Sequence, residues 1–245
     1  MCGIVGILGK QAVADQLVEA LRRLEYRGYD SAGVATVENG HLDRRRAEGK
    51  LKNLETRLRA EPLTGTAGIG HTRWATHGGP VERNAHPHMT TRVSVVHNGI
   101  IENFRELKDE LIAEGVTFET DTDTEVVSHL ATRALERGAA PQAAVEETLT
   151  RIRGAFALAF IFAGNDNLMI GARQGPPLAI GYGDGEMFIG SDAIALAPLT
   201  DTISYLEDGD WAVLTREGVV VRDGAGRIVE RAKLKAVGSA FLVDK

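Results

Sequence analysis

The sequence contains a single cysteine, Cys2, among its 245 residues. One cysteine cannot form a disulfide within the chain, so this thiol has to be explained by packing, metal binding or reactivity. Long apolar runs are also missing: no stretch approaches the roughly 20 residues of a membrane span. The apolar run at residues 4–8 is too short for the core of a signal peptide. We therefore expect a cytoplasmic protein without a membrane partner.

An excess of positive charge is absent as well. The formal net charge is -6, from 28 Lys and Arg against 34 Asp and Glu. Binding to a nucleic-acid backbone needs clustered Lys and Arg that replace counterions. The basic run at residues 44–46 is followed by Glu48 and lies beside a predicted turn, which favours a solvated strand face. The composition thus argues against a nucleic-acid partner.

Strand and helix patterns can both be recognised along the chain. Residues 31–37 and 41–47 flank Asn39-Gly40, a dipeptide suited to positive backbone dihedrals, and predict a hairpin. Gly28 can adopt the left-handed conformation and is predicted to end the first helix. The apolar spacing predicts helices at residues 12–26, 52–60, 102–114, 124–137 and 141–152. Strands are predicted at residues 2–9, 67–71, 92–97, 155–162, 168–172, 178–180, 187–190, 211–214 and 219–221.

The order of these elements bears on the fold class. Helices grouped between two runs of strands, without regular strand–helix–strand alternation, favour an α+β layered sandwich over a doubly wound parallel fold. From Ala155 onward the chain is predicted to be mostly sheet. We expect one domain at residues 1–236, and residues 237–245 to begin an interdomain linker.

Cys2 stands directly after the initiator methionine. Removal of Met1 would give it a free α-amine of pKa about 7.7–8.0 beside a thiol of pKa about 8.5. One residue would then supply both nucleophile and base, and no separate histidine would be required. The alternatives are that Cys2 is a small buried hydrophobe or that its position is accidental.

An attacked amide also needs donors aimed at the developing oxyanion. The side-chain amide of Asn98 and the backbone N–H of Gly99, at the predicted end of one strand, would supply two such donors. The alternative is that Asn98-Gly99 forms an ordinary hairpin turn.

Two further segments carry groups suited to recognition. In the loop at residues 71–78, Arg73 can bind a carboxylate through two parallel N–H bonds, and Trp74 offers an apolar wall or lid. The alternative for this loop is a surface arrangement with Arg stacked on Trp. Segment 121–125 precedes a predicted helix, and a carboxylate in it could bind an ammonium group. The alternative for this segment is N-capping of the helix through an Asp or Thr side chain.

Five of the seven histidines fall between positions 71 and 97, so a metal centre has to be considered. Their spacing matches no helical zinc signature, and His86-Pro87-His88 lies in a predicted loop without a suitably spaced third ligand. We expect neither a metal nor a cofactor. A metal-dependent amidohydrolase built on these histidines is the alternative.

Together these motifs resemble the class II, N-terminal nucleophile glutaminase domain of the glutamine–fructose-6-phosphate aminotransferases, also called glucosamine-6-phosphate synthases. Segments 25–31 and 72–77 are similar to this family rather than to amidophosphoribosyltransferase, asparagine synthetase or glutamate synthase. The matching segments, which follow the same order and span about half of the chain, are residues 1–6, 24–33, 71–78, 84–88, 96–103 and 122–126.

The resemblance implies a four-layer αββα sandwich, the N-terminal nucleophile hydrolase fold, with two antiparallel sheets between helix layers. It also implies hydrolysis of L-glutamine to glutamate and ammonia through a γ-glutamyl thioester on Cys2, with the α-amine as base. Asn98 and Gly99 would form the oxyanion hole. Arg73 would bind the α-carboxylate of glutamine and Asp123 its α-amine. The remaining implied site residues are Trp74 as a mobile cover, Thr76 and His77 as lining residues, and Arg27 near the nucleophile.

In this family the ammonia passes to a C-terminal sugar isomerase domain that binds fructose 6-phosphate. The full-length enzyme is expected to be a homodimer. No isomerase domain follows in this sequence, so we expect sugar-phosphate synthesis to need a part that this chain lacks. A noncatalytic glutamine sensor that retains the pocket is the second hypothesis.

Overall fold

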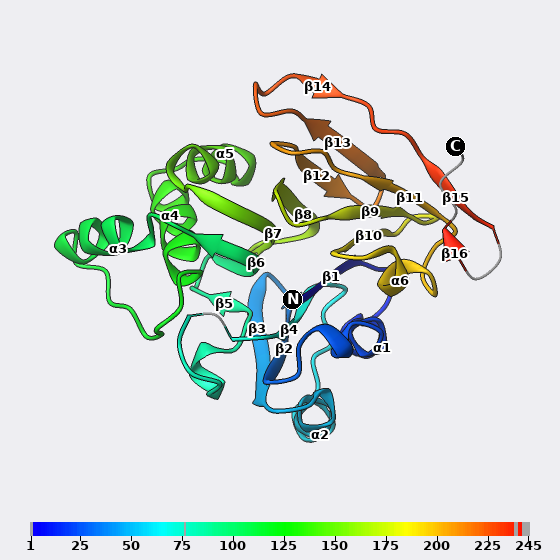
Figure 1. Cartoon of the computed structure of the whole chain (residues 1–245), viewed down its shortest axis with the longest axis horizontal. Coiled ribbons are helices and arrows are strands. Elements are labelled where there is room, and N and C mark those ends of the chain that lie inside the picture. Colours follow the sequence, from blue (N-terminus) through cyan, green and yellow to red (C-terminus); the bar gives the residue numbers. More distant parts are fainter. Residues whose placement is uncertain (1, 76, 238–239, 242–245) are drawn as a thin grey trace.

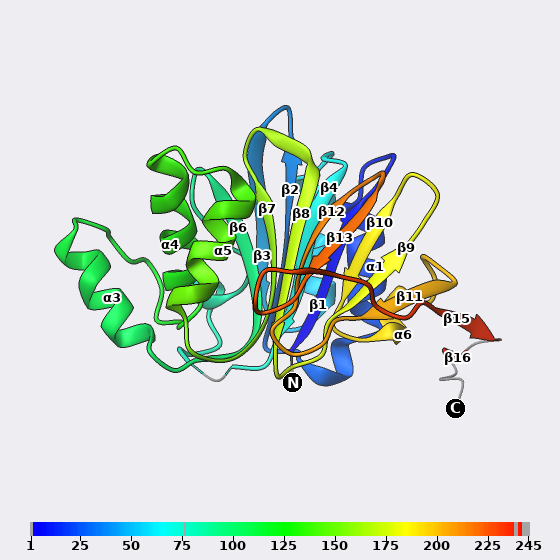
Figure 2. The ribbon, with the colours of Figure 1, turned by 90° about the horizontal axis from the view of Figure 1, so that it is seen from above.

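The computed structural model describes residues 2–75, 77–237 and 240–241. The strands form two antiparallel sheets that pack face to face, and helices cover the outer face of each sheet (Figures 1 and 2). Helices α3, α4 and α5 lie on one side and α1 and α2 on the other (Figure 1). The predicted α+β fold, a four-layer αββα sandwich, is confirmed.

Within the described ranges, the larger sheet has nine strands in the order β16-β15-β11-β9-β10-β1-β4-β2-β3. Strand β1 therefore lies inside this sheet, between β10 and β4, and its start is held on both sides. The strands are β1 (Gly3–Leu8), β2 (Ser31–Glu38), β3 (His41–Glu48), β4 (Ala67–Arg73), β9 (Ala179–Tyr182), β10 (Met187–Gly190), β11 (Thr202–Tyr205), β15 (Leu234–Val237) and β16 (Ala240–Phe241). The outer face of this larger sheet is covered by α1 (Ala14–Arg22) and α2 (Leu51–Ala60), with α6 (Ala193–Leu196) next to β10.

The smaller sheet has, among the described residues, seven strands in the order β14-β13-β12-β8-β7-β6-β5. They are β5 (His88–Met89), β6 (Val93–Ile101), β7 (Gly154–Phe162), β8 (Asn165–Gln174), β12 (Trp211–Thr215), β13 (Gly218–Arg222) and β14 (Ile228–Val229). The helices on its outer side are α3 (Phe104–Ala113), α4 (Glu125–Glu136) and α5 (Pro141–Arg151).

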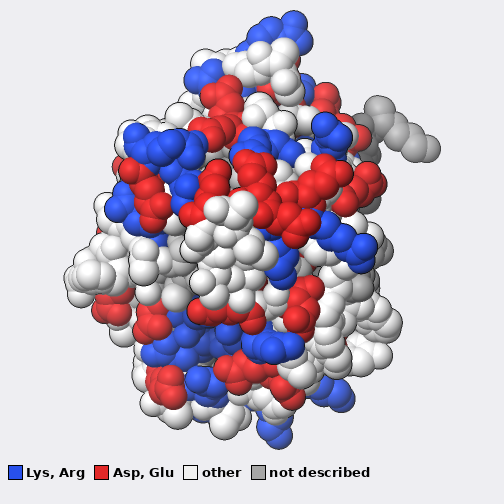
Figure 3. All heavy atoms as spheres, turned by 90° about the vertical axis from the view of Figure 1, so that its left-hand side faces the viewer, with Lys and Arg blue, Asp and Glu red and all other residues white. Residues whose placement is uncertain are grey.

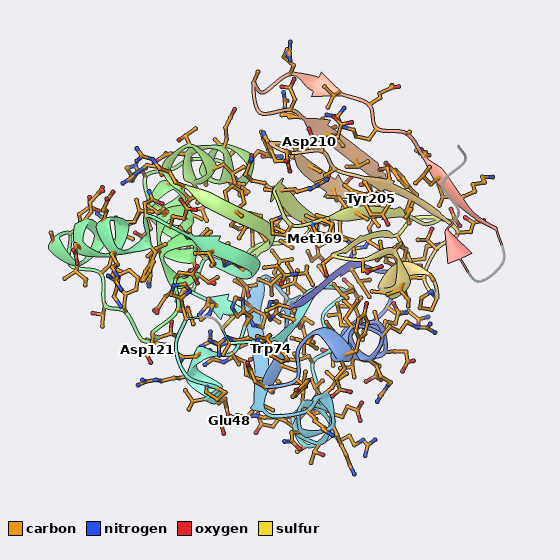
Figure 4. The ribbon with its side chains drawn as sticks, viewed as in Figure 1. Glu48, Trp74, Asp121, Met169, Tyr205 and Asp210 are labelled. Carbon is orange, nitrogen blue, oxygen red and sulfur yellow. The ribbon has the colours of Figure 1, made fainter. Side chains whose placement is uncertain are left out.

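The two sheets approach closely because small residues face the space between them. Ile4 and Leu8 of β1 belong to the core between the sheets, whereas Val5 packs in the core under α1. A Cβ added at Gly6 would lie 2.4 Å from Sδ of Met169. The glycine thus leaves room for the Met169 side chain, which lies at the centre of the molecule (Figure 4). Each large apolar side chain buried in this way contributes roughly 1.5–3 kcal/mol.

The predicted Asn39-Gly40 hairpin is confirmed. Asn39 has φ 51° and Gly40 has φ 79°. Glu38 pairs directly with His41, which makes the loop two residues long. Positive φ at both central residues is the backbone of a type I′ turn, whose twist matches the strands that it joins.

Gly28 does not end the first helix, so that prediction was wrong. Helix α1 stops at Arg22, and a 3₁₀ turn, η1 (Glu25–Arg27), follows. Gly28 itself is extended, with φ −165°. A Cβ there would lie 2.7 Å from the backbone carbon of Arg73, so the glycine is needed for close approach between the chain after η1 and the end of β4.

Strand β6 does not end before Asn98-Gly99, and this dipeptide is not a turn. The strand continues to Ile101, and Gly99 pairs with Phe156 of β7. Gly99 has φ +123°, and a Cβ there would lie 2.0 Å from the carbonyl oxygen of Ala155. Only glycine fits this position, because both the dihedral and the neighbouring backbone exclude a side chain.

Several short elements were not predicted, namely α6, β5, β11, β14, β15 and β16. Strand β15 pairs with β11 through Lys235 and Thr202, in a part of the chain whose composition resembles a linker. Residues 238–239 and 242–245 of the predicted linker lie outside the described residues, and the boundary at residue 236 stays a prediction. No helix in the described ranges is long and apolar enough to cross a membrane.

Charges of both signs are interspersed on the face of the molecule that carries α3 (Figure 3). Ion pairs tie this layer together, for example Arg133 with Glu114 at 2.5 Å and Arg151 with Glu110 at 2.6 Å. Exposed pairs of this kind contribute at most about 1 kcal/mol each.

The basic run at residues 44–46 is not simply a solvated strand face. Nη1 of Arg44 donates to the Pro87 carbonyl at 3.2 Å, and Nη1 of Arg46 donates to the Ala85 carbonyl at 3.0 Å. Arg45 pairs with Asp43 at 2.6 Å. Two of these arginines therefore bind the backbone carbonyls on either side of His86.

We expect Gly33→Ala to destabilise the fold by roughly 1–3 kcal/mol, because it overpacks a closed interface. A Cβ at Gly33 would lie 2.1 Å from the backbone carbonyl oxygen of His86, which cannot rotate away. Urea unfolding measures the effect. The matched control is Gly79→Ala, since a Cβ there meets nothing within 4 Å and should change stability by no more than about 0.5 kcal/mol. Equal stability of the two variants would contradict this packing.

Candidate active site

A cavity of about 370 Å³ opens where β1 begins and β4 ends, beside the last part of β6. Seven of the residues predicted for the site line it: Cys2, Arg73, Trp74, His77, Asn98, Gly99 and Asp123. The other lining residues are His86, His97, Ile100, Thr122, Thr124, Pro176, Pro177 and Ser191.

The thiol of Cys2 lies against the backbone of Trp74. The Trp74 N–H donates to the sulfur at 3.2 Å, and the thiol donates to the Trp74 carbonyl at 3.5 Å. Burial raises the pKa of the Cys2 thiol, and the Trp74 N–H and the charge of Arg73 offset this only in part. Among the described residues, no histidine nitrogen bonds to this sulfur. The thiol is therefore held in its protonated form until a base acts on it.

The Asn98 side chain joins β6 to the residue that precedes β1. Its Nδ2 donates to the carbonyl oxygen of Cys2 at 3.0 Å, and its Oδ1 lies 3.0 Å from Nε2 of His71. Since a carbonyl can only accept, the nitrogen of the amide faces Cys2. Asn98 is thus oriented with its N–H groups toward the thiol-bearing residue.

Arg73 is 3% exposed and holds one wall of the cavity. Its Nη2 donates to the carbonyls of His77 at 2.5 Å and Gly78 at 3.0 Å, and its Nη1 donates to Gly79 at 3.1 Å. The carboxylate of Asp30 lies 3.8 Å away. Arg73 therefore lines the cavity and also fixes the loop at residues 77–79 through three backbone carbonyls.

Asp123 is anchored by a backbone bond and does not cap α4. Its Oδ2 accepts the N–H of Ile101 at 2.7 Å. The N-cap residue of α4, Thr124, makes no side-chain cap bond, and its hydroxyl instead meets Nδ1 of His97 at 2.9 Å. The alternative that an Asp or Thr side chain caps this helix does not hold, because no side-chain cap bond forms at Thr124.

Glu125 secures the chain that carries Asp123. Its carboxylate accepts the N–H groups of Glu119 and Thr120, each at 2.8 Å, and the Thr120 hydroxyl at 2.7 Å. Burial raises the pKa of Glu125, but bonds from His129, Glu119 and Thr120 outweigh it and lower this pKa to about 2. The carboxylate stays charged at neutral pH and fixes the turn before α4.

Four of the clustered histidines pack as neutral rings beside the cavity. His71 stacks on His86 with ring centres 4.1 Å apart, and His88 meets His86 edge-on at 4.6 Å. Burial lowers the pKa of His71 to about 3 and also lowers the pKa values of His86, His88 and His97. In the ranges described, no group of three or more His, Cys, Asp or Glu side chains is placed to hold a metal ion.

Trp74 lines the cavity and is 49% exposed, which places its side chain at the rim. Figure 4 labels this residue in the fold. Its ring meets Tyr29 edge-on, with centres 5.5 Å apart. The only other tryptophan of the sequence, Trp211 in β12, is 5% exposed and packs under the helices of the smaller sheet.

The sequence profile of the glutamine amidotransferase domain matches residues 71–198, just over half of the chain. The chain belongs to the glutamine amidotransferase domain family. This match and the relatives described next confirm the resemblance that the motifs indicated.

Relatives of this glutamine amidotransferase domain match it from end to end. Glutamine–fructose-6-phosphate aminotransferases (isomerizing) from Bradyrhizobium diazoefficiens and Brucella suis are each 69% identical over all 245 residues. The chain spans 40% of the length of each of these two proteins.

Solved structures agree with the fold of the glutamine amidotransferase domain. Glutamine phosphoribosylpyrophosphate amidotransferase from B. subtilis, complexed with ADP and GMP, superposes with a TM-score of 0.78 at 24% identity, covering 93% of this chain and 50% of that one. A structure described as the allosteric regulatory enzyme of purine biosynthesis gives 0.77 at 27% identity, covering 91% and 49%.

Two predicted site residues of this glutamine amidotransferase domain cannot be placed in the cavity. Thr76 and the side chain of Arg27 lie outside the described residues. In contrast, Ser191 lines the cavity but was not predicted. Its hydroxyl accepts the N–H of Ile4 at 2.9 Å, a contact that depends on the pairing of β10 with β1 and has no local sequence signal.

The neutral histidines predict that the domain loses stability in mild acid. Their folded pKa values lie below the ordinary value of 6.5, so the unfolded chain binds more protons, and stability present above pH 6.5 is lost as the pH falls toward the folded value of about 3 for His71. Between about pH 7.5 and about pH 5.0, His71 alone should remove roughly 2 kcal/mol from the free energy of unfolding.

Urea unfolding at the two pH values measures this loss. The protonation of Glu125 does not interfere, because its pKa is 4.5 in the unfolded chain and about 2 in the folded domain, both below the pH interval that is measured. A variant with one buried histidine fewer, His88→Phe, should lose less stability over the same interval. Equal unfolding free energies at both pH values for the unmodified chain would refute the assignment.

Proposed function

We propose that this domain hydrolyses L-glutamine to L-glutamate and ammonia, with Cys2 as an N-terminal nucleophile. One observation carries the proposal: a single cavity of about 370 Å³ contains the thiol of Cys2, the amide of Asn98, the guanidinium of Arg73 and the carboxylate of Asp123. These groups complement the side-chain amide, the α-carboxylate and the α-amine of glutamine. A pocket with a few convergent polar groups is typical of a small-molecule site.

The base in this proposal is the α-amine of Cys2, set free when Met1 is removed. Burial raises the pKa of the thiol, so the nucleophile needs a group that takes its proton. The buried histidines are poorly suited to this task, because burial lowers their pKa values and, within the described contacts, none bonds to the sulfur. An amine on the same residue satisfies the requirement for a base within reach.

The reaction then proceeds in two steps, formation of a thioester and its hydrolysis. The Cys2 thiol gives its proton to the α-amine, and the sulfur attacks the side-chain carbonyl carbon of glutamine. The ammonium group then protonates the departing nitrogen, which leaves as ammonia, and a γ-glutamyl thioester remains. Water attacks this thioester, and glutamate and the free thiol are released. Asn98 Nδ2 and the Gly99 N–H are proposed to donate to the negative oxygen in both steps.

Substrate recognition follows from the charges around the cavity. Asp123 is proposed to bind the α-ammonium group of glutamine, and Arg73 is proposed to bind its α-carboxylate. Arg73 would do so while keeping its bonds to the loop at residues 77–79. The lining roles predicted for Trp74, His77, Thr76 and Arg27 are part of this proposal.

We further propose that the ammonia serves glucosamine 6-phosphate synthesis. The support is the 69% identity to proteins named glutamine–fructose-6-phosphate aminotransferase, of which this chain spans 40%. The ammonia would pass to a sugar isomerase domain that binds fructose 6-phosphate, in a full-length enzyme that is a homodimer. The linker at residues 237–245 and the cytoplasmic location stay predictions. The chain alone should release ammonia, and glucosamine 6-phosphate should form only when the isomerase part is joined to it.

Cys2→Ala should abolish glutamine hydrolysis and leave the fold intact. The loss of the nucleophile should reduce glutamate release by a factor of roughly a thousand or more, while the melting temperature stays within a few degrees. A coupled glutamate assay and thermal unfolding measure the two effects, and mass spectrometry records whether Met1 has been removed.

A glutamine-derived electrophile provides the complementary measurement, because it should label Cys2 covalently in the wild-type chain. Reversible glutamine binding without glutamate release would instead favour the noncatalytic sensor. Full turnover by a chain that retains Met1 would rule out the proposed base.

Arg73→Lys should raise the KM for glutamine roughly tenfold or more, because a forked donor is replaced by a point charge. The control is Arg83→Lys in the same region. Arg83 forms an exposed ion pair with Asp121 at 2.6 Å and does not line the cavity, so its replacement should leave KM unchanged. Equal KM values for both variants would remove Arg73 from the carboxylate site.

A further inference from the structure

The Asn98 amide is held between two partners from the other side of the sandwich, the residue that precedes β1 and a residue of β4. On one side Nδ2 donates to the Cys2 carbonyl at 3.0 Å, and on the other Oδ1 lies 3.0 Å from Nε2 of His71. His71 belongs to β4 and is fully buried. It does not line the cavity, so it cannot touch a substrate bound there.

The bonds around His71 determine which ring nitrogen carries the proton. Nε2 lies 3.0 Å from two oxygens, Oδ1 of Asn98 and the backbone carbonyl of His97. A backbone carbonyl accepts hydrogen bonds and never donates them, so Nε2 must hold the hydrogen. Nδ1 is buried and has no partner, which suits the nitrogen without a hydrogen. Burial lowers the pKa of His71 to about 3, so the ring carries one proton at neutral pH.

This pattern excludes the reversed orientation of the Asn98 amide. Turned by half a rotation, the amide would place Oδ1 against the Cys2 carbonyl oxygen and Nδ2 against the N–H of His71. Two acceptors would then face each other, and two donors would do the same, inside a buried site where unmatched polar groups are costly. The reversed amide would also present an oxygen where the proposed reaction develops negative charge.

The ring of His71 is itself fixed in place. It stacks on His86 at 4.1 Å with an angle of 15° between the rings. Nδ1 of His86 in turn accepts the N–H of His97 at 3.3 Å, and Arg46 holds the carbonyl of Ala85 at 3.0 Å. The donor that reaches Asn98 is therefore supported by β6 on one side and by segment 85–88 on the other.

We propose that His71 is a positioning residue for glutamine hydrolysis: its Nε2–H fixes the Asn98 amide with the N–H groups toward Cys2 and the cavity. One Nδ2 hydrogen serves the Cys2 carbonyl, and the other is left for the oxyanion of the substrate. This role rests on the proposed function, because it acts only through Asn98 on the developing charge.

The first test replaces the donor while keeping the ring. His71→Phe retains an aromatic ring to stack on His86 but removes the N–H. The kcat for glutamine hydrolysis should fall roughly tenfold to a hundredfold with KM changed by less than about threefold, because the oxyanion donor affects the transition state and not the bound substrate. His71→Gln, which restores an N–H donor, should recover part of the kcat.

His88→Phe is the matched control. His88 is equally buried and contacts His86 in the same cluster, but its Nε2 bonds to Thr122 at 3.1 Å and not to Asn98. Its replacement should lower the melting temperature as His71→Phe does, yet leave kcat within about threefold of the wild type. An effect on kcat equal to that of His71→Phe would mean that the cluster acts through stability alone and would overturn the proposal.

A double-mutant cycle separates positioning from independent effects. In an Asn98→Ala background, His71→Phe should reduce kcat by less than about twofold further, because its target is gone. The same reduction in both backgrounds would overturn the proposal, as would full kcat in the single His71→Phe variant. If the wild-type chain released no glutamate, the proposed function would fail and this role with it, whereas an active wild type with a fully active His71→Phe variant would refute this role alone.

A measurement on the unaltered chain does not depend on any variant folding. Nitrogen NMR of protein labelled in its histidines should show His71 as the neutral Nε2–H tautomer at neutral pH. A ring protonated on Nδ1 or on both nitrogens would overturn the proposal.

Discussion

The hydrogen bond from the Asn98 amide to the Cys2 carbonyl joins the two sheets at the cavity, and the geometry of the site depends on it. It forms because the start of β1 and the end of β6 meet across a narrow space between the sheets. That space is narrow because Gly6, Ala157 and Ala159 face it and larger side chains such as Met169 fill the gaps that they leave. Packing far from the cavity thus sets the distance between a thiol and a polar amide, and close packing makes this distance hard to change.

Much of the fold could be predicted because its signals are local. The Asn39-Gly40 hairpin and helices α2 to α5 follow from turn chemistry and apolar spacing that neighbouring residues carry themselves. The errors arose where tertiary contacts override those signals. Asn98-Gly99 has the composition of a turn, yet pairing with β7 keeps it in a strand, and Gly28 serves the approach to Arg73 rather than a helix end. Strands of two to four residues, such as β14 and β16, carry too few side chains to show a period.

In the candidate site, too, local sequence signals could be predicted and tertiary contacts could not. Motifs in the sequence named Cys2, Arg73, Asn98 and Asp123, because their chemistry is distinctive and their segments are compact. No motif named Ser191, Pro176 or Pro177, since these residues come to the cavity only through the pairing of distant strands. The hydrogen-bond partners of the site residues could not be predicted from the sequence either. Segment 121–125 was compatible with a cap for α4, whereas Asp123 accepts the N–H of Ile101. The histidines were recognised as a cluster, but only their stacking and bonds show that they are neutral packing groups.

The unequal exposure of the two tryptophans has a practical consequence. Trp74 is half exposed at the rim of the cavity, while Trp211 is buried under the helices of the smaller sheet. A water-soluble quencher of fluorescence therefore reaches Trp74 far more readily, so the quenchable part of the emission reports on the mouth of the cavity. The protein thus carries a built-in optical probe of ligand entry, with Trp211 as an internal reference for the state of the core.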